Sequence, residues 1–184
     1  MRKRYLLLLL TLIFGLALLA VDRYTEDFIP SLTEQQSREP DYYGEGLFNR
    51  QYDASGRLAN TFVSAKSTHF PFNKMTEFST PVLMTTDEDG KQWQLTAISG
   101  HIQDDEHTLY LNGNVEIRPL SEDADPLLIQ TESLTYNSET RIAQTQDPVT
   151  ITGAQATLTS IGMTMDIDRQ QIEFNQQVNT RYVP

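Results

Sequence analysis

The side chains that could bind a metal ion lie in one short polar segment. His101 and His107 flank the acidic run Asp104–Glu106, and a third histidine, His69, lies further upstream. Imidazole and carboxylate groups are ligands that zinc accepts, but zinc motifs usually place them at fixed spacings such as i, i+4. This segment lacks such a pair. A polar turn between two strands explains it better, so we expect neither a metal site nor a bound cofactor.

Catalytic motifs are equally sparse. Asp166 and Asp168 could form a carboxylate pair for glycoside cleavage, which needs two carboxyl groups about 5–10 Å apart in a cleft, but they too lie where a turn is expected. The chain has no Cys, no Gly-x-Ser-x-Gly elbow and no phosphate-binding loop. The acidic stretch Glu122–Asp125 is too short and irregular for a calcium loop. These observations predict a protein that is not an enzyme.

The overall charge narrows the range of partners. The chain has 14 Lys and Arg residues against 25 Asp and Glu residues, which gives a net charge of −11 at pH 7. Such a surface repels nucleic acid and anionic headgroups. Nucleic acid is therefore excluded as an expected partner.

The N-terminal segment has the composition of a membrane anchor. Leu6–Val21 contains no charge and would span roughly 24 Å as a helix. Three cations, Arg2–Arg4, precede it and acidic residues follow, so the positive-inside rule puts residues 1–5 in the cytoplasm. A cleaved signal peptide is the alternative, but a cut after Ala20 would put Leu18 at a position that prefers a small residue. We expect a single-pass anchor at residues 6–21, a polar tether at 22–40 and an exported domain at 41–184.

The exported part contains an internal repeat. Four windows align without gaps: Thr61–Met84, Gln94–Ile117, Leu128–Ile151 and Thr157–Thr180. Apolar residues alternate with polar ones inside each window, which is typical of strands with one buried face. Each window is predicted to form two short strands separated by a polar break. The expected inward face comprises Phe62, Phe78, Leu95, Ile102, Leu109, Leu111, Val115, Ile117, Ile129, Tyr136, Val149, Ile151, Met165, Ile172 and Phe174.

The same pattern predicts an all-β fold in which a sheet of two-strand units folds over to bury its apolar face, as in a jelly roll, sandwich or solenoid. Gly113 and Gly153 each follow a strand-like run, and we expect both to relieve the backbone at a bulge. The final strand carries Val178, Thr180 and Tyr182 on one face and lacks the lysines that usually protect an edge. It is therefore predicted to accept a partner strand.

Several segments together resemble a known family. They are the N-terminal anchor, YDASGRL at Tyr52–Leu58, Pro81-Val82-Leu83, TLYLNGNVEI at Thr108–Ile117 and PVTITG at Pro148–Gly153. Their order and spacing resemble the LptC family of lipopolysaccharide export proteins of Gram-negative bacteria. The soluble bridge protein of that pathway shares the repeat, and the anchor is what favours LptC.

The resemblance implies a twisted antiparallel β-jelly roll held at the cell inner membrane by one N-terminal transmembrane helix, with the domain in the periplasm. It further implies that the chain receives lipopolysaccharide from an inner-membrane ABC transporter and passes it to the periplasmic bridge protein. The acyl chains would bind the inward residues, and neighbouring rolls would join at their edges. The apolar pattern alone is equally compatible with an ordinary packed core. An anchored β-repeat scaffold without a lipid site is therefore the alternative.

Overall fold

A computed structural model describes residues 13–18, 21, 39–120 and 126–182. The chain divides into two compact units, Met1–Ser37 and Arg38–Pro184. Residues 13–18 and 21 are helical. Within the described ranges, no helix has both the length and the apolar character needed to cross a membrane. Much of the expected anchor and nearly all of the expected tether lie outside the described residues.

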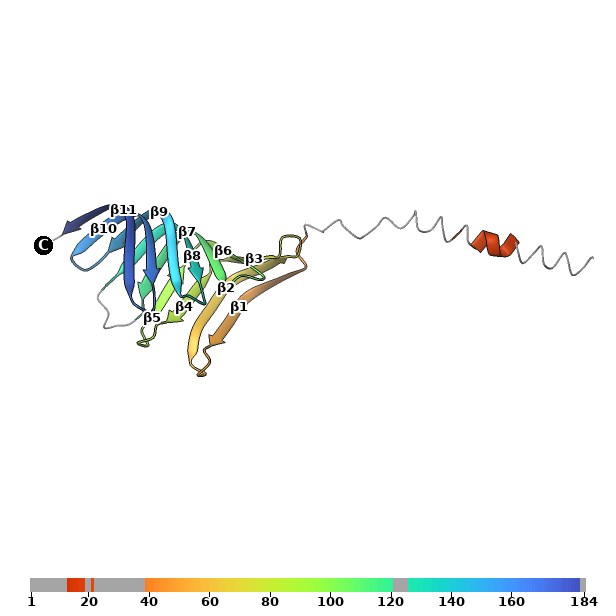
Figure 1. Cartoon of the computed structure of the whole chain (residues 1–184), viewed down its shortest axis with the longest axis horizontal. Coiled ribbons are helices and arrows are strands. Elements are labelled where there is room, and N and C mark those ends of the chain that lie inside the picture. Colours follow the sequence, from red (N-terminus) through yellow and green to blue (C-terminus); the bar gives the residue numbers. More distant parts are fainter. Residues whose placement is uncertain (1–12, 19–20, 22–38, 121–125, 183–184) are drawn as a thin grey trace, which may run out of the picture. The chain divides into compact units, whose positions relative to one another are not determined.

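The described residues of the second unit form a single 11-stranded sheet whose pairings are all antiparallel. The strands are β1 (Tyr42–Tyr52), β2 (Leu58–Phe70), β3 (Met75–Ser79), β4 (Val82–Thr86), β5 (Gln92–Thr96), β6 (Ser99–Gln103), β7 (Thr108–Pro119), β8 (Leu128–Asn137), β9 (Ile142–Thr152), β10 (Ala156–Asp166) and β11 (Gln171–Tyr182). They follow one another along the length of the domain, from β1 at one end to β10 and β11 at the other (Figure 1).

Each sequence repeat corresponds to one hairpin, as the alternating pattern predicted. The last two windows are the β8–β9 and β10–β11 hairpins. In the first two windows one strand of the hairpin is broken in the middle: β3 and β4 both pair with β2, and β5 and β6 both pair with β7. The expected turns are at residues 104–107, which join β6 to β7, and at residues 167–170, which join β10 to β11. They hold His107 and Asp168, whereas His101 lies within strand β6 and Asp166 is the last residue of β10, so these two candidates are not in turns.

A line of left-handed residues runs across the middle of the sheet. Positive φ angles occur at Gly46 (66°), Thr80 (46°), Gly113 (80°), Gly162 (76°) and Gln177 (51°). The pairing register of β7, β10 and β11 shifts near these positions. Bulges bend a strand and increase its twist. When neighbouring strands bend at matching positions, the sheet folds over along a crease.

The crease divides the sheet into two leaves. The first leaf contains β3, β6 and the parts of the longer strands that pair with them or continue them, including residues 108–112, 133–137 and 171–176. The second leaf contains β4, β5 and the remaining halves, including 115–119, 128–131 and 178–182. The core lies between the leaves.

Cross-strand ladders of inward side chains build this core. In the second leaf, the ladder runs through Phe62, Leu83, Leu95, Ile117, Ile129, Ile151 and Leu158. In the first leaf, it runs through Ile102, Leu109, Tyr136, Ala143, Met165 and Ile172. Leu95, Ile117, Ile129 and Met165 are 0 % exposed.

Two sequence expectations need correction. The gap-free alignment of the windows matches Val82 with Val115 and Met84 with Ile117, which would put both on the inward face. Leu83 is instead the inward residue there and pairs with Phe62 and Leu95. The alignment fails because the break at Thr80 shifts the register by one residue, which moves side chains to the opposite face. Gly153 is not at a bulge. It lies in the turn between β9 and β10, where its N–H donates to the carbonyl of Ala156.

Gly113 does lie at a bulge, with a φ of 80° at the register shift between Asn112 and Val115. A Cβ at this position would approach Ile98 within 3.1 Å. Both the backbone conformation and the contact therefore favour glycine here.

Candidate functional site

A pocket of about 370 Å³ opens between the leaves at the β1 end of the domain. Its residues come from both leaves and from β1: Leu47, Asn49, Arg50, Gln51, Asn60, Phe62, Phe78, Leu83, Ile102, His107, Leu109, Tyr136 and Ser138. Phe62, Phe78, Ile102, Leu109 and Tyr136 were all expected on the inward face. The pocket therefore combines apolar walls with a set of polar residues.

At the β1 end the apolar ladders of the two leaves continue, but the side chains there do not fill the space between the leaves, and this leaves the pocket. Phe62 and Phe78 are only partly buried and contact each other edge to face, with ring centroids 4.8 Å apart. On β1, the residue paired with Phe62 is the polar Asn49. An apolar concavity with a few polar groups has the character of a ligand site.

Beyond the pocket the interior is closed. Leu95, Val115, Ile117, Ile129 and Met165 are 0 % exposed. The remaining expected inward residues belong to the same core: Leu111, Val149 and Ile151 are buried in it, and Ile172 and Phe174 are partly buried against it. The expected lipid face therefore includes residues that line a pocket and residues that fill a packed core, and Leu109 and Tyr136 belong to both sets.

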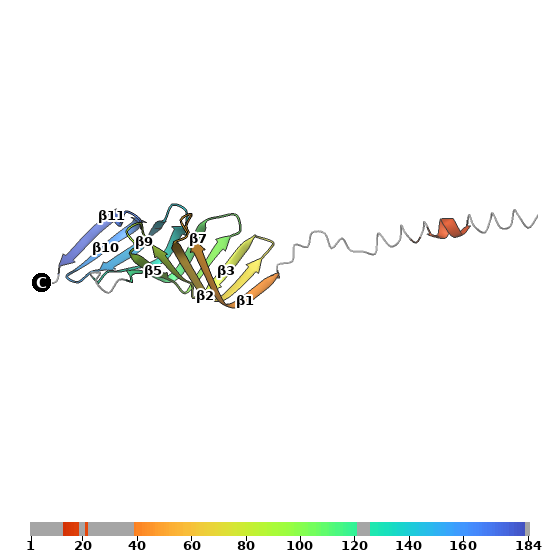
Figure 2. The same ribbon diagram turned by 90° about the horizontal axis from the view of Figure 1, so that it is seen from below.

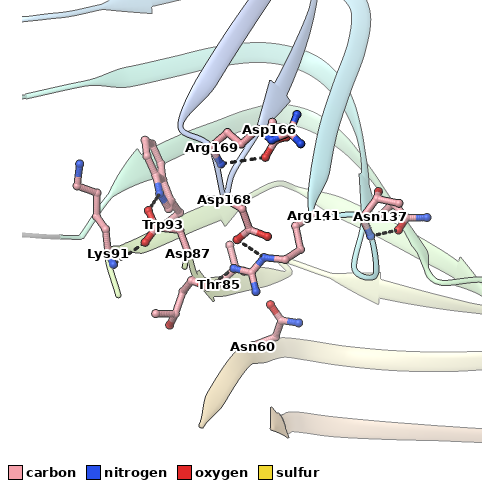
Figure 3. Close-up of polar contacts among 12 residues, drawn as sticks. Asn60, Thr85, Asp87, Lys91, Trp93, Asn137, Arg141, Asp166, Asp168 and Arg169 are labelled. Atoms are coloured by element: carbon pink, nitrogen blue, oxygen red, sulfur yellow. Dashed lines mark hydrogen bonds and ion pairs between the residues drawn. The ribbon is translucent and has the colours of Figure 1, made fainter. Parts of the chain in front are cut away.

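Figure 3 shows a polar network around Arg141, Asp168 and Thr85, which contacts the pocket residue Tyr136 through Thr85. The Arg141 Nε atom lies 2.7 Å from Asp168 Oδ1, and its Nη2 donates to Thr85 Oγ1 at 3.3 Å and to the carbonyl of Thr86. Thr85 Oγ1 in turn shares a hydrogen bond of 3.3 Å with the hydroxyl of Tyr136. Burial raises the pKa of Asp168, and burial likewise raises the pKa of Tyr136.

The network joins residues that are far apart in the sequence, which is why sequence reasoning missed it. Thr85 is on β4, Arg141 ends the β8–β9 turn, and Asp168 is in the β10–β11 turn. Asp87 extends the polar cluster, because its Oδ2 accepts from Trp93 Nε1 at 3.3 Å and its Oδ1 accepts from the Lys91 N–H at 2.7 Å. A single arginine in a turn carries no sequence signal for such a role.

His69 forms a second polar cluster. Its Nδ1 lies 2.6 Å from Asp41 Oδ1, and its Nε2 lies 3.1 Å from Asp104 Oδ2. The two carboxylates raise the pKa of His69 through hydrogen bonds, and the bond from His69 lowers the pKa of Asp41. The Tyr42 ring stacks on the imidazole with centroids 5.3 Å apart. This cluster fastens the start of β1 to β2 and to the β6–β7 turn.

The remaining candidate residues have local structural contacts. His101 stacks on Tyr110, and His107 Nε2 lies 3.3 Å from Glu139 Oε1. Asp166, the last residue of β10, pairs with Arg169 in the turn that follows. Among residues 13–18, 21, 39–120 and 126–182, no group of three or more His, Cys, Asp or Glu side chains could hold a metal ion.

Comparison with known proteins places this site in context. Residues 6–183 match the family described as "Lipopolysaccharide-assembly, LptC-related". The chain belongs to the LptC family. It is 26 % identical over 161 residues to the lipopolysaccharide export system protein LptC of Haemophilus influenzae, covering 78 % of this chain and 77 % of the relative. It is 25 % identical over 147 residues to LptC of Escherichia coli K12, covering 79 % and 76 %.

A solved structure is similar to this LptC-family chain in fold. It is LptH of Pseudomonas aeruginosa, described as the LptA-homologous periplasmic component of the lipopolysaccharide transport device. The TM-score is 0.52 at 10 % identity, with 76 % of this chain and 96 % of LptH covered. The family resemblance seen in the sequence is thus confirmed, and so is the expectation of a largely antiparallel β fold.

Both ends of the sheet in this LptC-family chain are edge strands. Within the described part of the chain, β1 pairs only with β2 and β11 only with β10, and the two edges lie at opposite ends of the domain (Figure 2). On β11, Val178 is 50 % exposed and Tyr182 is 63 % exposed, and Thr180 between them is also exposed. The expected partner edge therefore presents an accessible strand.

Proposed function

We propose that this LptC-family chain is an inner-membrane-anchored transfer component that receives lipopolysaccharide from an ABC transporter and passes it to a periplasmic bridge protein. The observation that carries the proposal is the apolar pocket at the β1 end, whose walls continue as inward ladders toward β11. A lipid tail entering the pocket would contact the first residues of apolar ladders that continue through the packed core along the domain.

The pocket suits an acyl chain better than a polar ligand. The aliphatic and phenyl side chains of its lining come from Leu47, Phe62, Phe78, Leu83, Ile102 and Leu109. Each methylene buried there contributes about 0.8 kcal/mol, so ten methylenes contribute roughly 8 kcal/mol before ordering costs. Such a gain would hold the lipid firmly. Onward movement therefore requires a neighbouring roll with an apolar groove of its own, and an energy source outside this chain.

The proposed topology follows the charge pattern at the N-terminus. Residues 1–5 are cytoplasmic, residues 6–21 form the transmembrane anchor, residues 22–40 form a periplasmic tether, and residues 41–184 form the periplasmic β-jelly roll. A reporter fused after Pro184 that is active only in the cytoplasm would contradict this topology. A mature N-terminus at residue 21 would contradict the anchor.

The two sheet edges divide the proposed partners. The β1 edge would pair with the transporter, because it directly follows the proposed tether in the sequence and its residues line the pocket. The β11 edge, with Val178, Thr180 and Tyr182, would pair with a strand of the bridge protein and so extend the sheet. Thr180 is the ladder position opposite Leu158, so an added strand would continue the inward face.

Site-resolved photo-crosslinking tests this function in the full chain with lipopolysaccharide. Probes are placed at inward positions Phe62, Ile102 and Tyr136, and matched probes at outward positions Tyr110, Glu116 and Glu173. We expect lipid capture at the first set and little at the second, because alternate residues of a strand point to opposite faces. Equal capture from both sets, in variants shown to be folded, would reject the specific interior site.

The packed interior around Leu95, Ile117 and Met165 supports a second candidate, an anchored β-repeat scaffold that binds only partner proteins. In that case the pocket is a docking notch for a partner. Capture of transporter or bridge protein at Phe62, without capture of lipid, would support the scaffold over the transfer function.

A further inference from the structure

The open side of the folded sheet, opposite the crease, is bridged by polar contacts between three turns. The β4–β5 turn (87–91) belongs to the second leaf, and the β8–β9 turn (138–141) and the β10–β11 turn (167–170) belong to the first. Lys91 Nζ donates to Gln170 Oε1 at 2.9 Å, and Gln170 Nε2 donates to Asp89 Oδ2 at 3.3 Å. We call these three turns and their contacts the polar seam.

Arg141 forms the inner part of the polar seam (Figure 3). From the first leaf it donates to Thr85 and to the Thr86 carbonyl in the second leaf, and Asp168 holds its guanidinium from the neighbouring turn. The Arg141 and Asp168 side chains are 18 % and 22 % exposed. Burial raises the pKa of Asp168 and the charge of Arg141 opposes that shift, so removal of either partner would leave a partly buried charge without its counter-charge.

The polar seam reaches the pocket through Tyr136. This residue lines the pocket, is 1 % exposed, and shares a hydrogen bond with the same Thr85 that accepts from Arg141. Two other hydrogen bonds among the pocket residues stay within one leaf: that of Gln51 with Asn60 in the second leaf, and that of Ser138 with His107 in the first. Of these three contacts, only that of Tyr136 with Thr85 joins the two leaves.

We propose that the polar seam is a gate that controls passage of an apolar chain from the pocket into the interior, with Arg141, Asp168 and Gln170 as its positioning residues. The inference rests on the proposed function. When the β8–β9 and β10–β11 turns move away from the β4–β5 turn, Tyr136 loses its link to Thr85 and the core ladders separate enough to accept the chain.

Polar contacts suit such a gate because they can open reversibly. Asp89, Lys91 and Gln170 are near the surface, so water replaces their hydrogen bonds as the leaves part, and each contact contributes only modestly to the closed state. An apolar chain between the leaves then restores the burial that the core residues lose. An empty domain favours the closed state, and a loaded domain favours the open one.

A reversible disulfide tests the gate directly. The chain has no cysteine, so Asp89→Cys with Gln170→Cys introduces one pair, which joins the leaves across the polar seam. The full chain also carries a photo-crosslinker at Phe62 in the pocket or at Phe174 on β11, beyond the seam. Lipopolysaccharide is added, and capture is measured before and after reduction.

We expect the oxidised protein to retain capture at Phe62 and lose it at Phe174, with recovery on reduction. The matched control is Gln94→Cys with Arg118→Cys, a pair on adjacent strands within the second leaf whose side chains bond at 2.8 Å. Its disulfide cannot hold the leaves together, so capture at Phe174 should be unchanged. A complementary variant, Lys91→Ala with Gln170→Ala, weakens the seam at exposed positions and should increase the rate of capture at Phe174.

The outcomes separate the two proposals. If the fully oxidised seam variant captures lipid at Phe62 and also captures as much at Phe174 as the reduced variant does, the gate is overturned and the transfer function is left intact. Absence of capture at Phe174 in the reduced protein also overturns the gate. Absence of lipid capture at Phe62 in every state overturns the transfer function, and the gate with it.

Discussion

Removal of a core residue and removal of a pocket residue should have different consequences. Leu95 is 0 % exposed and lies between Leu83 and Ile117 in the second-leaf ladder. Leu→Ala in a core costs about 2–5 kcal/mol, and we expect about 4 for Leu95→Ala because the neighbouring strands are tied by backbone pairing and cannot collapse into the cavity.

Phe62→Ala should cost much less. Phe62 is only partly buried, lines the pocket, and contacts Phe78 at a centroid distance of 4.8 Å. Complete burial of such a side chain contributes about 1.5–3 kcal/mol, so a partly buried one should contribute about 1–2. The new space joins an existing pocket and leaves no closed cavity. Capture of lipopolysaccharide should fall in this variant, because the apolar wall is reduced.

Urea unfolding measures the contrast. Trp93 is the single tryptophan and is 4 % exposed, so its fluorescence reports loss of the core. With a denaturant slope of about 2 kcal/mol per molar, the midpoint should fall by about 2 M for Leu95→Ala and by about 0.5–1 M for Phe62→Ala. Equal shifts in the two variants would refute the distinction between pocket and core, and with it the assignment of Phe62 to a ligand site.

Three further predictions concern other parts of the domain. His69→Asn should lower the urea midpoint most between about pH 4 and 6.5. The raised pKa of His69 makes its contribution to stability complete below pH 6.5 and lost as the pH rises through the pKa of the folded state, and the lowered pKa of Asp41 makes the contribution of Asp41 complete above pH 3.8. An equal effect of the substitution at pH 5.5 and pH 9 would contradict the ionic cluster. Gly100→Ala should destabilise the domain by about 1–3 kcal/mol, because the new Cβ would lie 2.8 Å from the Tyr110 carbonyl, and an unchanged melting temperature would show that the strands can separate. Deletion of residues 177–184 should abolish pull-down of the bridge protein and retain the transporter, and undiminished bridge binding by the folded truncation would exclude the β11 edge.

The repeat pattern was sufficient to predict the hairpins and most of the inward face. Leu95, Ile117 and Ile129 follow from period-two alternation alone, because a strand with one buried face permits only one register. The alignment gave the wrong face for Val82 and Met84. The break at Thr80 shifts the register there, and no glycine marks that break in the sequence as Gly113 marks the bulge in β7. The turns at 104–107 and 167–170 were predicted, but His101 and Asp166 were assigned to them and instead belong to the adjoining strands β6 and β10. The different role of Gly153 depends on backbone geometry.

The site was predictable only in part, for a physical reason. Phe62 and Leu95 occupy equivalent positions in the repeat, and both are apolar, so the sequence cannot tell which one faces a filled core. That difference arises from the strands placed around each residue. The contact of Arg141 with Thr85 depends on how the leaves fold together, which brings residues from β4 and the β8–β9 turn into one network.

The transfer function is tested most directly by energy-dependent photo-crosslinking in vesicles that contain lipopolysaccharide, the transporter and the full chain with a probe at Phe62. If the chain receives lipid from the transporter, capture at Phe62 should rise when ATP is added, and a probe at the outward Tyr110 should show no rise. Capture at Phe62 that is absent, or the same with and without ATP, would contradict the function proposed for this protein.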